Sequence, residues 1–397
     1  MTAMEVPEPR VDWRSKGFFL PAGERSASDY AREKPSLFGG GFTWPVLTLR
    51  QSAAEANIAT MAAYCARHDL DFAPHAKTTM APGLLAAQFA AGAWGMTVAT
   101  PSQALVLRRL GVQRIQIANE VLDATALRWL AEESAEIYIQ ADSLAGVEAA
   151  ARAGRIRVFA ELGHPGGRTG VRTLDELEEV ARAITEAESL EFAGVTAYEG
   201  QLPTEPEVDA FLDQLVAGVS RLRAAGLMPP GARVSAGGSA WFDRVVARLA
   251  ALPRDLRLIL RSGASVTHDD GFYAERTPFR RVPDEGPLTA ALEIWAQVLS
   301  VPEKGLAIAG MGKRDAPFDE GLPVAWEVRR DGAKTDTGPI AVTKLNDHHT
   351  YLAADGLQPG DLIRFGISHP CTAFDKWRHI PVVDDDHRVV DVLQTYL

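Results

Sequence analysis

Short apolar runs and amphipathic stretches alternate along the chain from about residue 70 to residue 270. The apolar runs, such as the one with Ile115 and Ile117, are typical of buried parallel strands. The stretches 174–187 and 208–225 carry apolar residues at helical spacing and predict helices. Eight strands are predicted in this region, over residues 71–75, 95–99, 114–118, 136–140, 156–161, 192–198, 232–236 and 257–261.

Eight βα units with short loops predict a closed β/α barrel. An open doubly wound sheet is the alternative, but no Gly-x-Gly-x-x-Gly motif follows the first strand to favour it. After about residue 275 the pattern changes to strands separated by turns such as Asp331-Gly332 and Pro359-Gly360. These strands are expected over residues 292–299, 305–309, 324–329, 340–345, 362–367 and 389–393.

The chain is therefore predicted to be an α/β protein, with a (β/α)8 barrel followed by an all-β domain. We place the barrel at residues 52–275 and the β domain at residues 276–397. Residues 1–51 precede the first barrel strand and contain the strand-like stretch 44–49. We expect this N-terminal segment to pair with the β domain, which would make that domain discontinuous.

Composition and charge narrow the kinds of function. The formal net charge of −11 argues against a nucleic-acid partner, because phosphate binding needs a basic face. The two cysteines, Cys65 and Cys371, argue against a disulfide framework. The N-terminus lacks the pattern of a secretory signal, and no apolar run approaches membrane-spanning length. We expect a soluble cytoplasmic protein with a small-molecule partner and no membrane partner.

A lysine lies at the end of the first predicted strand, in the run from Pro74 to Thr79 with the sequence Pro-His-Ala-Lys-Thr-Thr. In β/α barrels the chemistry takes place at the C-terminal ends of the strands. The amine of Lys77 could there form a Schiff base with pyridoxal phosphate, although a lone lysine at a strand end is more often a solvated cation. His75 shares its strand face and could orient the lysine or a substrate.

Two glycine-containing turns follow the seventh and eighth predicted strands, where barrels often bind phosphate. Glycines let backbone amides approach an anion, and a helix beginning near Ala240 would add its dipole. One such turn alone is usually only a turn, but two at these strands form a candidate phosphate site. Its predicted members are Ser235, Gly237, Gly238, Ser239, Gly263 and Ala264.

Two ligand-type side chains follow the predicted strand 362–367. On an extended backbone, residues i and i+2 point the same way, so His369 and Cys371 would share one face. Imidazole and thiolate suit zinc, but two ligands do not complete a tetrahedral site. Water or substrate would supply the remaining positions of a catalytic metal, whereas an ordinary buried cysteine is the alternative.

These motifs together resemble the D-serine dehydratase and D-threonine aldolase family, from about residue 40 to the end of the chain. The resemblance is carried by the lysine motif, by Gly167-Arg168-Thr169-Gly170 and by the run from Ser368 to Trp377. It implies an alanine-racemase-type barrel in which Lys77 holds pyridoxal phosphate. It also implies that Arg168 approaches the phenolic oxygen of the cofactor and that Tyr198 contacts its ring. From the residues alone, Arg168 could be a surface arginine and Tyr198 a core aromatic.

The resemblance further implies a divalent metal, with zinc favoured, on His369 and Cys371. His348, in Asn346-Asp347-His348, is implied to lie near that metal in a supporting or proton-transfer role, so Lys77 and His348 are the predicted catalytic residues. D-serine dehydratases carry His-x-Cys at this place, as this chain does, whereas D-threonine aldolases typically carry His-x-Asp. A homodimer is expected, because the barrel mouths of this family are completed by the partner's β domain.

The implied reaction is the dehydration and deamination of a β-hydroxy D-amino acid, of the D-serine or D-threo-3-hydroxyaspartate type, to a 2-oxo acid and ammonia. An aldolase that yields glycine and an aldehyde is the nearest alternative. An amino acid racemase and a pyridoxal-phosphate carrier without turnover are the others.

Overall fold

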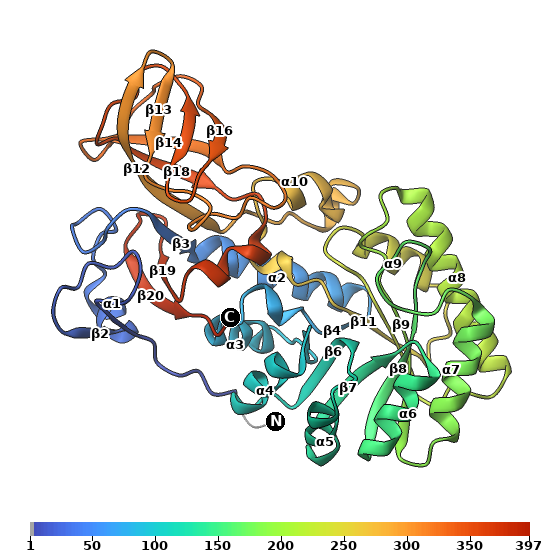
Figure 1. Cartoon of the computed structure of the whole chain (residues 1–397). Coiled ribbons are helices and arrows are strands. Elements are labelled where there is room, and N and C mark those ends of the chain that lie inside the picture. The colour runs from blue at the N-terminus through green and yellow to red at the C-terminus, as the bar shows by residue number, and fades with distance from the viewer. Residues whose placement is uncertain (1–3) are drawn as a thin grey trace.

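The computed structural model describes residues 4–397, so the first three residues of the predicted N-terminal segment lie outside the described residues. It contains a parallel barrel below and an antiparallel β domain above it in Figure 1. The barrel strands are β4 (Asp71–Phe72), β5 (Met96–Val98), β6 (Arg114–Glu120), β7 (Glu136–Ala141), β8 (Ile156–Leu162), β9 (Leu190–Ala197), β10 (Arg233–Ala236) and β11 (Arg257–Leu260).

The barrel strands follow the order β4-β11-β10-β9-β8-β7-β6-β5, and all of their pairings are parallel. A parallel bridge between His75 and Thr97 brings the two ends of this order together. Helices cover the outside of the barrel. They are α2 (Gln51–Arg67), α3 (Pro82–Ala90), α4 (Pro101–Arg109), α5 (Ala124–Glu132), α6 (Leu144–Ala153), α7 (Leu174–Glu186), α8 (Glu205–Ala224) and α9 (Phe242–Leu249).

The predicted helical spacing at residues 174–187 corresponds to α7. A capping box at Thr173 and Glu176 satisfies backbone N–H groups at the start of this helix. Its apolar stripe, which includes Leu177 and Ile184, is fully buried in the main barrel cluster. The sequence pattern therefore fixes both where this helix begins and which face it turns inward.

The β domain is a largely antiparallel sheet, and the predicted fold class is confirmed. Its strands follow the order β15-β14-β18-β12-β13-β17-β16, with β3 pairing β12 and β19, and β19 pairing β20. The strands are β3 (Val46–Arg50), β12 (Leu292–Glu303), β13 (Leu306–Ala309), β14 (Val324–Arg330), β15 (Ala333–Lys334), β16 (Ala341–Leu345), β17 (Thr350–Ala353), β18 (Leu362–Gly366), β19 (His379–Val383) and β20 (Val389–Gln394).

Strand β3 joins the N-terminal segment to the β domain, pairing antiparallel with β12 over residues 46–49. The same segment forms β1 (Arg10–Asp12), β2 (Glu24–Ser26) and α1 (Ala27–Glu33), which lie beside β20 at the left of Figure 1. A short helix, α10 (Phe272–Arg276), connects the barrel to the β domain. No helix in the described part of the chain is long and apolar enough to cross a membrane.

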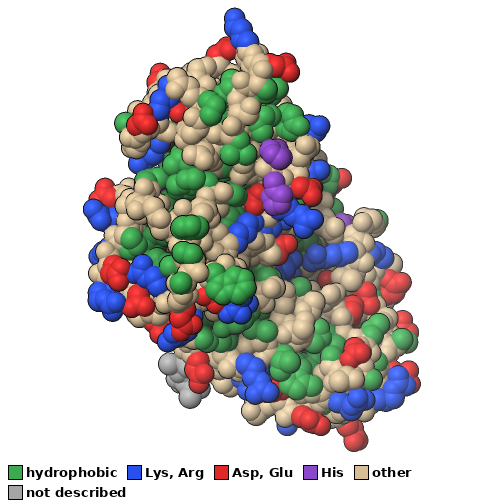
Figure 2. All heavy atoms as spheres, turned by 60° about the vertical axis from the view of Figure 1, so that its left-hand side comes forward, with side chains coloured by type: hydrophobic (Ala, Val, Ile, Leu, Met, Phe, Trp, Pro, Cys, Tyr) green, Lys and Arg blue, Asp and Glu red, His purple; other side chains and the backbone are tan. Residues whose placement is uncertain are grey.

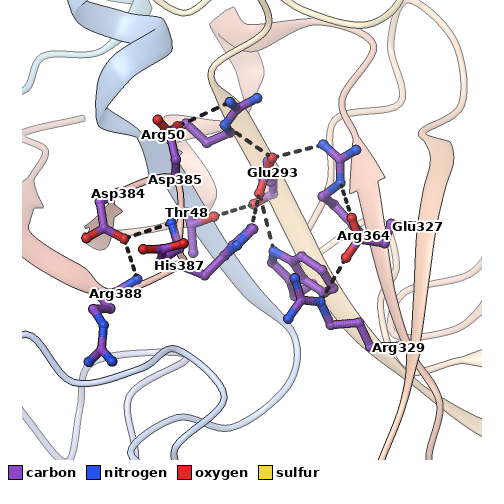
Figure 3. A network of polar contacts seen from close by, with 12 residues as sticks. Thr48, Arg50, Glu293, Glu327, Arg329, Arg364, Asp384, Asp385, His387 and Arg388 are labelled. Atoms are coloured by element: carbon purple, nitrogen blue, oxygen red, sulfur yellow. Dashed lines mark hydrogen bonds and ion pairs between the residues drawn. The ribbon is translucent and has the colours of Figure 1, made fainter. Parts of the chain in front are cut away.

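A buried carboxylate lies at the centre of a charged network in the β domain (Figure 3). Glu293 on β12 is 4% exposed, accepts a hydrogen bond from Arg364 at 2.9 Å and lies 3.2 Å from His387 Nε2. Arg50, at the end of β3, approaches the same carboxylate at 3.7 Å. Burial raises the pKa of Glu293, but the contact with His387 and the charges of Arg364 and Arg50 outweigh burial and lower it.

The segment after β20 contacts the loop that follows the predicted lysine. The hydroxyl of Thr395 donates to the carbonyl oxygen of Thr79 at 2.6 Å, and the N–H of Tyr396 donates to that of Met80 at 3.0 Å. Met80 has a positive φ of 41°, which side-chain-bearing residues rarely adopt. These two hydrogen bonds help to hold the loop in its turn.

Candidate active site

A cavity of about 510 Å³ opens between the barrel mouth and the β domain. Barrel residues at the C-terminal strand ends line one side, α10 lines another, and the segment after β18 lines a third. All the predicted site residues except Ser235 and His348 line this cavity. The predicted residues that meet there are His75, Lys77, Arg168, Tyr198, Gly237, Gly238, Ser239, Gly263, Ala264, His369 and Cys371.

Lys77 lies in a turn of 3-10 helix, Ala76–Thr78, which follows the short first barrel strand after residues 73–75. Burial lowers the pKa of its amine, and the positive charges of Arg168 and Arg261 lower it further against an opposing effect of Cys371. A lowered pKa favours the neutral amine, which is the form that attacks a carbonyl carbon. The position therefore fits a lysine that holds an aldehyde cofactor.

His75 lines the cavity together with Lys77. Its Nδ1 is buried and has no hydrogen-bond partner within the described residues. Burial, together with the positive charges of Lys77 and Arg261, holds the pKa of His75 well below its ordinary value, so the ring is neutral. A side chain on Gly263 would lie 2.5 Å from the carbonyl oxygen of His75, so only glycine allows this close approach.

The turn after β10 contains Gly237 with a φ of +96°. The N–H groups of Gly237 and Gly238 donate to the buried carboxylate of Glu199 at 3.1 and 2.6 Å. These two amides, which the sequence predicts for a phosphate, therefore already have an anionic partner in the protein. Glu199 holds the shape of the turn.

Two other members of the predicted phosphate site, Ser239 and Ala264, lie beside this turn. The hydroxyl of Ser239 lies 3.1 Å from that of Ser262 and accepts a hydrogen bond from the N–H of Ala264 at 3.3 Å. Ser235 does not belong to this group, because its hydroxyl is fully buried and donates to Gln116 at 2.8 Å inside the barrel. An anion bound at Ser239 and Ala264 would replace these hydrogen bonds within the protein.

The charged side chains around the cavity are mainly basic. The guanidinium carbon of Arg168 lies 4.4 Å from the ring centroid of Tyr198, in a cation–π arrangement. Arg261 is buried, donates to the carbonyl oxygen of Ala197 and has an Nε without a partner within the described residues. This balance fits an anionic ligand such as pyridoxal phosphate with an amino acid. The basic residues that line the cavity are Lys77, Arg168, Arg261 and Arg276. A carboxylate, that of Glu320, also lines it.

The candidate metal ligands reach the cavity by a different backbone path from the one predicted. His369 is extended, but Pro370–Thr372 form a 3-10 turn, so strand alternation does not place Cys371. The imidazole Nδ1 of His369 lies 2.7 Å from Asp319, and Asp319 also accepts a hydrogen bond from the hydroxyl of Thr372 at 2.8 Å. A carboxylate on Nδ1 is the arrangement that orients a metal-binding histidine, leaving Nε2 for the ion.

The surroundings of His369 favour the protonated, positively charged form of its imidazole. Burial lowers the pKa of His369, but the hydrogen bonds and charges of Cys371 and Asp319 outweigh burial and raise it to about 9. Within residues 4–397, no group of three or more histidine, cysteine, aspartate or glutamate side chains is arranged to hold a metal ion. The donor pair fits a metal only if water or substrate supplies the remaining positions.

His348 does not reach the cavity. It lies on the loop between β16 and β17, with a side chain that is 68% exposed and Nδ1 3.7 Å from Asp315. Asp315 is itself paired with Lys16 at 2.7 Å. The geometry therefore gives no support to the proton-transfer role predicted for His348.

Several cavity residues escaped the sequence analysis. Arg261 directly follows the eighth strand, and this position was the only feature of the sequence that could have indicated a place in the cavity. Phe272, Tyr273 and Arg276 come from α10, which is too short to show a helical period. Asp319 contacts His369 although the two residues are 50 positions apart, so no local sequence pattern could predict the contact.

Comparisons with known proteins agree with this architecture. The family model described as "Alanine racemase, N-terminal domain" matches residues 49–252, and the one described as "Putative serine dehydratase domain" matches residues 291–383. A 3-hydroxy-D-aspartate aldolase of Paracoccus denitrificans (strain Pd 1222) is 26% identical over 343 residues, covering 82% of this chain and 84% of the relative. A D-threonine aldolase of Arthrobacter sp. is 27% identical over 361 residues, covering 86% of this chain and 89% of the relative.

Solved structures are similar over most of both chains. D-threonine aldolase from Filomicrobium marinum has a TM-score of 0.77 and 25% identity, and the match covers 89% of this chain and 95% of that one. D-threo-3-hydroxyaspartate dehydratase from Delftia sp. HT23 has a TM-score of 0.70 and 23% identity, covering 89% and 97%.

Proposed function

Since the chain belongs to the alanine racemase N-terminal domain family, we propose that it is a pyridoxal-phosphate-dependent lyase of β-hydroxy D-amino acids. The names of its relatives support this substrate class, because 3-hydroxy-D-aspartate, D-threonine and D-threo-3-hydroxyaspartate all carry a β-hydroxyl group. The observation that carries the proposal is that Lys77 and the His369–Cys371 pair line one cavity.

Each residue of the barrel mouth has a task in this proposal. Lys77 holds the cofactor and, once released by the substrate amine, takes the proton from Cα. Arg168 would approach the phenolic oxygen of the cofactor, Tyr198 would contact its ring, and Ser239 and Ala264 would hold the phosphate. When bound, pyridoxal phosphate supplies an electron sink that stabilises negative charge at Cα.

We favour dehydration over cleavage of the Cα–Cβ bond. Dehydration needs help for a departing hydroxide, and a zinc ion on His369 and Cys371 would supply Lewis acid chemistry at the β-oxygen. Cleavage instead needs a base for the β-hydroxyl proton, and the predicted candidate, His348, is exposed outside the cavity. The favoured products are a 2-oxo acid and ammonia.

We also propose that the protein is a homodimer. Figure 2 shows hydrophobic side chains on one face, above and beside a hollow in which basic, acidic and histidine side chains meet. Some of the large exposed hydrophobic residues belong to the N-terminal segment and the β domain, and such residues mark interaction surfaces when they cluster. They include Trp13, Phe19, Phe318, Leu322 and Trp326. Sedimentation that shows a fully active monomer would refute the dimer.

The reaction is tested by a screen of D- and L-β-hydroxy amino acids. The purified holoenzyme is assayed for a 2-oxo acid with ammonia, and separately for glycine with an aldehyde. Lys77→Ala is the inactive control. A 2-oxo acid from D-substrates supports the proposal, whereas an aldehyde as the main product would make the enzyme an aldolase.

The metal is tested separately. Chelation should abolish formation of the 2-oxo acid and leave cofactor absorbance and thermal unfolding nearly unchanged, because the β domain packs on an apolar cluster that includes neither His369 nor Cys371. Added zinc should restore activity, and Cys371→Ala should behave like the chelated enzyme. Full activity after chelation would show that Cys371 is only a structural residue.

A further inference from the structure

One cation of the cavity has no task in the proposed reaction. Arg276, at the end of α10, lines the cavity at its rim. Within residues 4–397 its guanidinium makes no ion pair with a carboxylate, and its carbon lies 4.1 Å from the ring centroid of Phe272. The other lining cations have different surroundings. Lys77 is assigned to the cofactor, Arg168 stacks on Tyr198, and Arg261 is buried and donates to the carbonyl oxygen of Ala197.

The position of Arg276 points to one side of the substrate. The rings of Phe272 and Tyr273 each lie 5.9 Å from the ring of His369. Arg276 therefore stands beside the aromatic wall that contacts the candidate metal ligand, where the β-oxygen of the substrate is placed under the proposed function. Under the proposed function, groups attached to Cβ would therefore lie on the side of the cavity that α10 lines.

The helix that presents Arg276 is anchored at its start. The carboxylate of Asp269 is 1% exposed and accepts hydrogen bonds from the N–H groups of Gly271, Tyr273 and Ala274 at 3.0, 2.9 and 3.0 Å. Because three hydrogen bonds to one buried carboxylate fix the first turn of α10, the guanidinium of Arg276 extends from a well-anchored helix.

We propose that Arg276 binds a carboxylate on Cβ of the substrate, so that the enzyme prefers dicarboxylic β-hydroxy D-amino acids to D-serine. This inference rests on the proposed function. A guanidinium presents a planar fork of donors that pairs with both oxygens of a carboxylate. Glu320, a carboxylate that also lines the cavity, would repel the substrate carboxylate, which favours a position beside Arg276 instead.

A binding test that needs no turnover separates this inference from the reaction. The holoenzyme is titrated with D-aspartate and with D-alanine, which lack a β-hydroxyl and cannot be dehydrated or cleaved, while cofactor absorbance is followed. The preference for D-aspartate should fall about 10-fold or more in Arg276→Gln, as expected for loss of a charge-assisted pair. Glu275→Gln, an exposed neighbour on α10 that does not line the cavity, is the matched control.

Kinetics then test the substrate preference. The ratio of kcat/KM for D-threo-3-hydroxyaspartate over that for D-serine should fall about 10- to 100-fold in Arg276→Gln. Equal losses on both substrates would mean that Arg276 binds the α-carboxylate and would overturn the inference. Arg276→Lys keeps the charge without the fork and should give a smaller fall, which covers the case in which Arg276→Gln does not fold.

Failure of the reaction is distinguishable from failure of the inference. If neither hydroxyamino acid is consumed, the proposed function is wrong, while the two titrations still report on Arg276. If both are consumed and wild type shows no preference for D-aspartate over D-alanine, the inference is wrong and the proposed function stands.

Discussion

Replacement of Glu199 by glutamine tests how the phosphate turn is held. The carboxylate is fully buried and accepts hydrogen bonds from the backbone N–H groups of Gly237 at 3.1 Å and Gly238 at 2.6 Å. Glutamine keeps the shape of the side chain but presents one oxygen and one amino group. The amino group cannot accept a hydrogen bond, so one of the two backbone N–H groups loses its partner.

The magnitude follows from these contacts. A hydrogen bond to a charged group contributes roughly 1.5–3 kcal/mol, and a buried donor left without a partner costs about 1–3 kcal/mol. Arg261 also loses a negative charge that favours its protonated form. We expect Glu199→Gln to lower the free energy of unfolding by about 3 kcal/mol.

Two measurements check this expectation. Denaturant unfolding of the cofactor-free protein reports the free energy of unfolding, and titration with pyridoxal phosphate reports the dissociation constant, which should rise about tenfold because the turn with Ser239 is less fixed. Glu132→Gln, at an exposed site on α5, is the control. If Glu199→Gln matched this control in both measurements, the turn would be held by its own backbone and our reasoning would be refuted.

Three further predictions concern other parts of the molecule. Borohydride reduction should fix the cofactor on the peptide that contains Lys77, and recovery of the label on another lysine would remove Lys77 from that role. Glu293→Gln should lower the free energy of unfolding by about 2–4 kcal/mol at neutral pH. Because the folded-state pKa of Glu293 is lowered, its contribution is present above the ordinary value of 4.5 and is lost as the pH falls through the folded value, so the difference from wild type should shrink in acid and a constant difference would contradict the network. His369→Ala should reduce kcat/KM about 100-fold and His348→Ala about twofold at most, and similar losses in the two variants would return His348 to the site.

The barrel could be predicted from the sequence because its strands are buried on both faces and appear as contiguous apolar runs. The run 114–118 became β6, Arg114–Glu120, with only its end extended. Strand β19, His379–Val383, was not predicted although all its residues are buried. Pro381 weakens its strand pattern, and complete burial removes the alternation that a half-exposed strand shows.

The site could be predicted where its residues form short motifs at strand ends. Lys77 and Gly263 reach the cavity from neighbouring strands because a closed barrel brings all strand ends to one mouth. The contact of Glu199 with Gly238 spans 39 positions and could not be predicted, since it depends on how two loops pack. The motif indicated His348 as a site residue, but it could not predict the direction of the loop, which places this side chain in solvent.

The contact between Thr395 and the loop after Lys77 has a consequence for biosynthesis. Thr395 is made 316 positions after Thr79, whose carbonyl oxygen it binds. At ribosomal speeds of roughly 5–20 residues per second, Thr395 is synthesised about 15–60 s after Thr79. A nascent chain with its barrel already out of the ribosome therefore still lacks part of the support for its lysine loop. We therefore expect the loop after Lys77 to reach its final conformation only in chains that already carry the whole β domain.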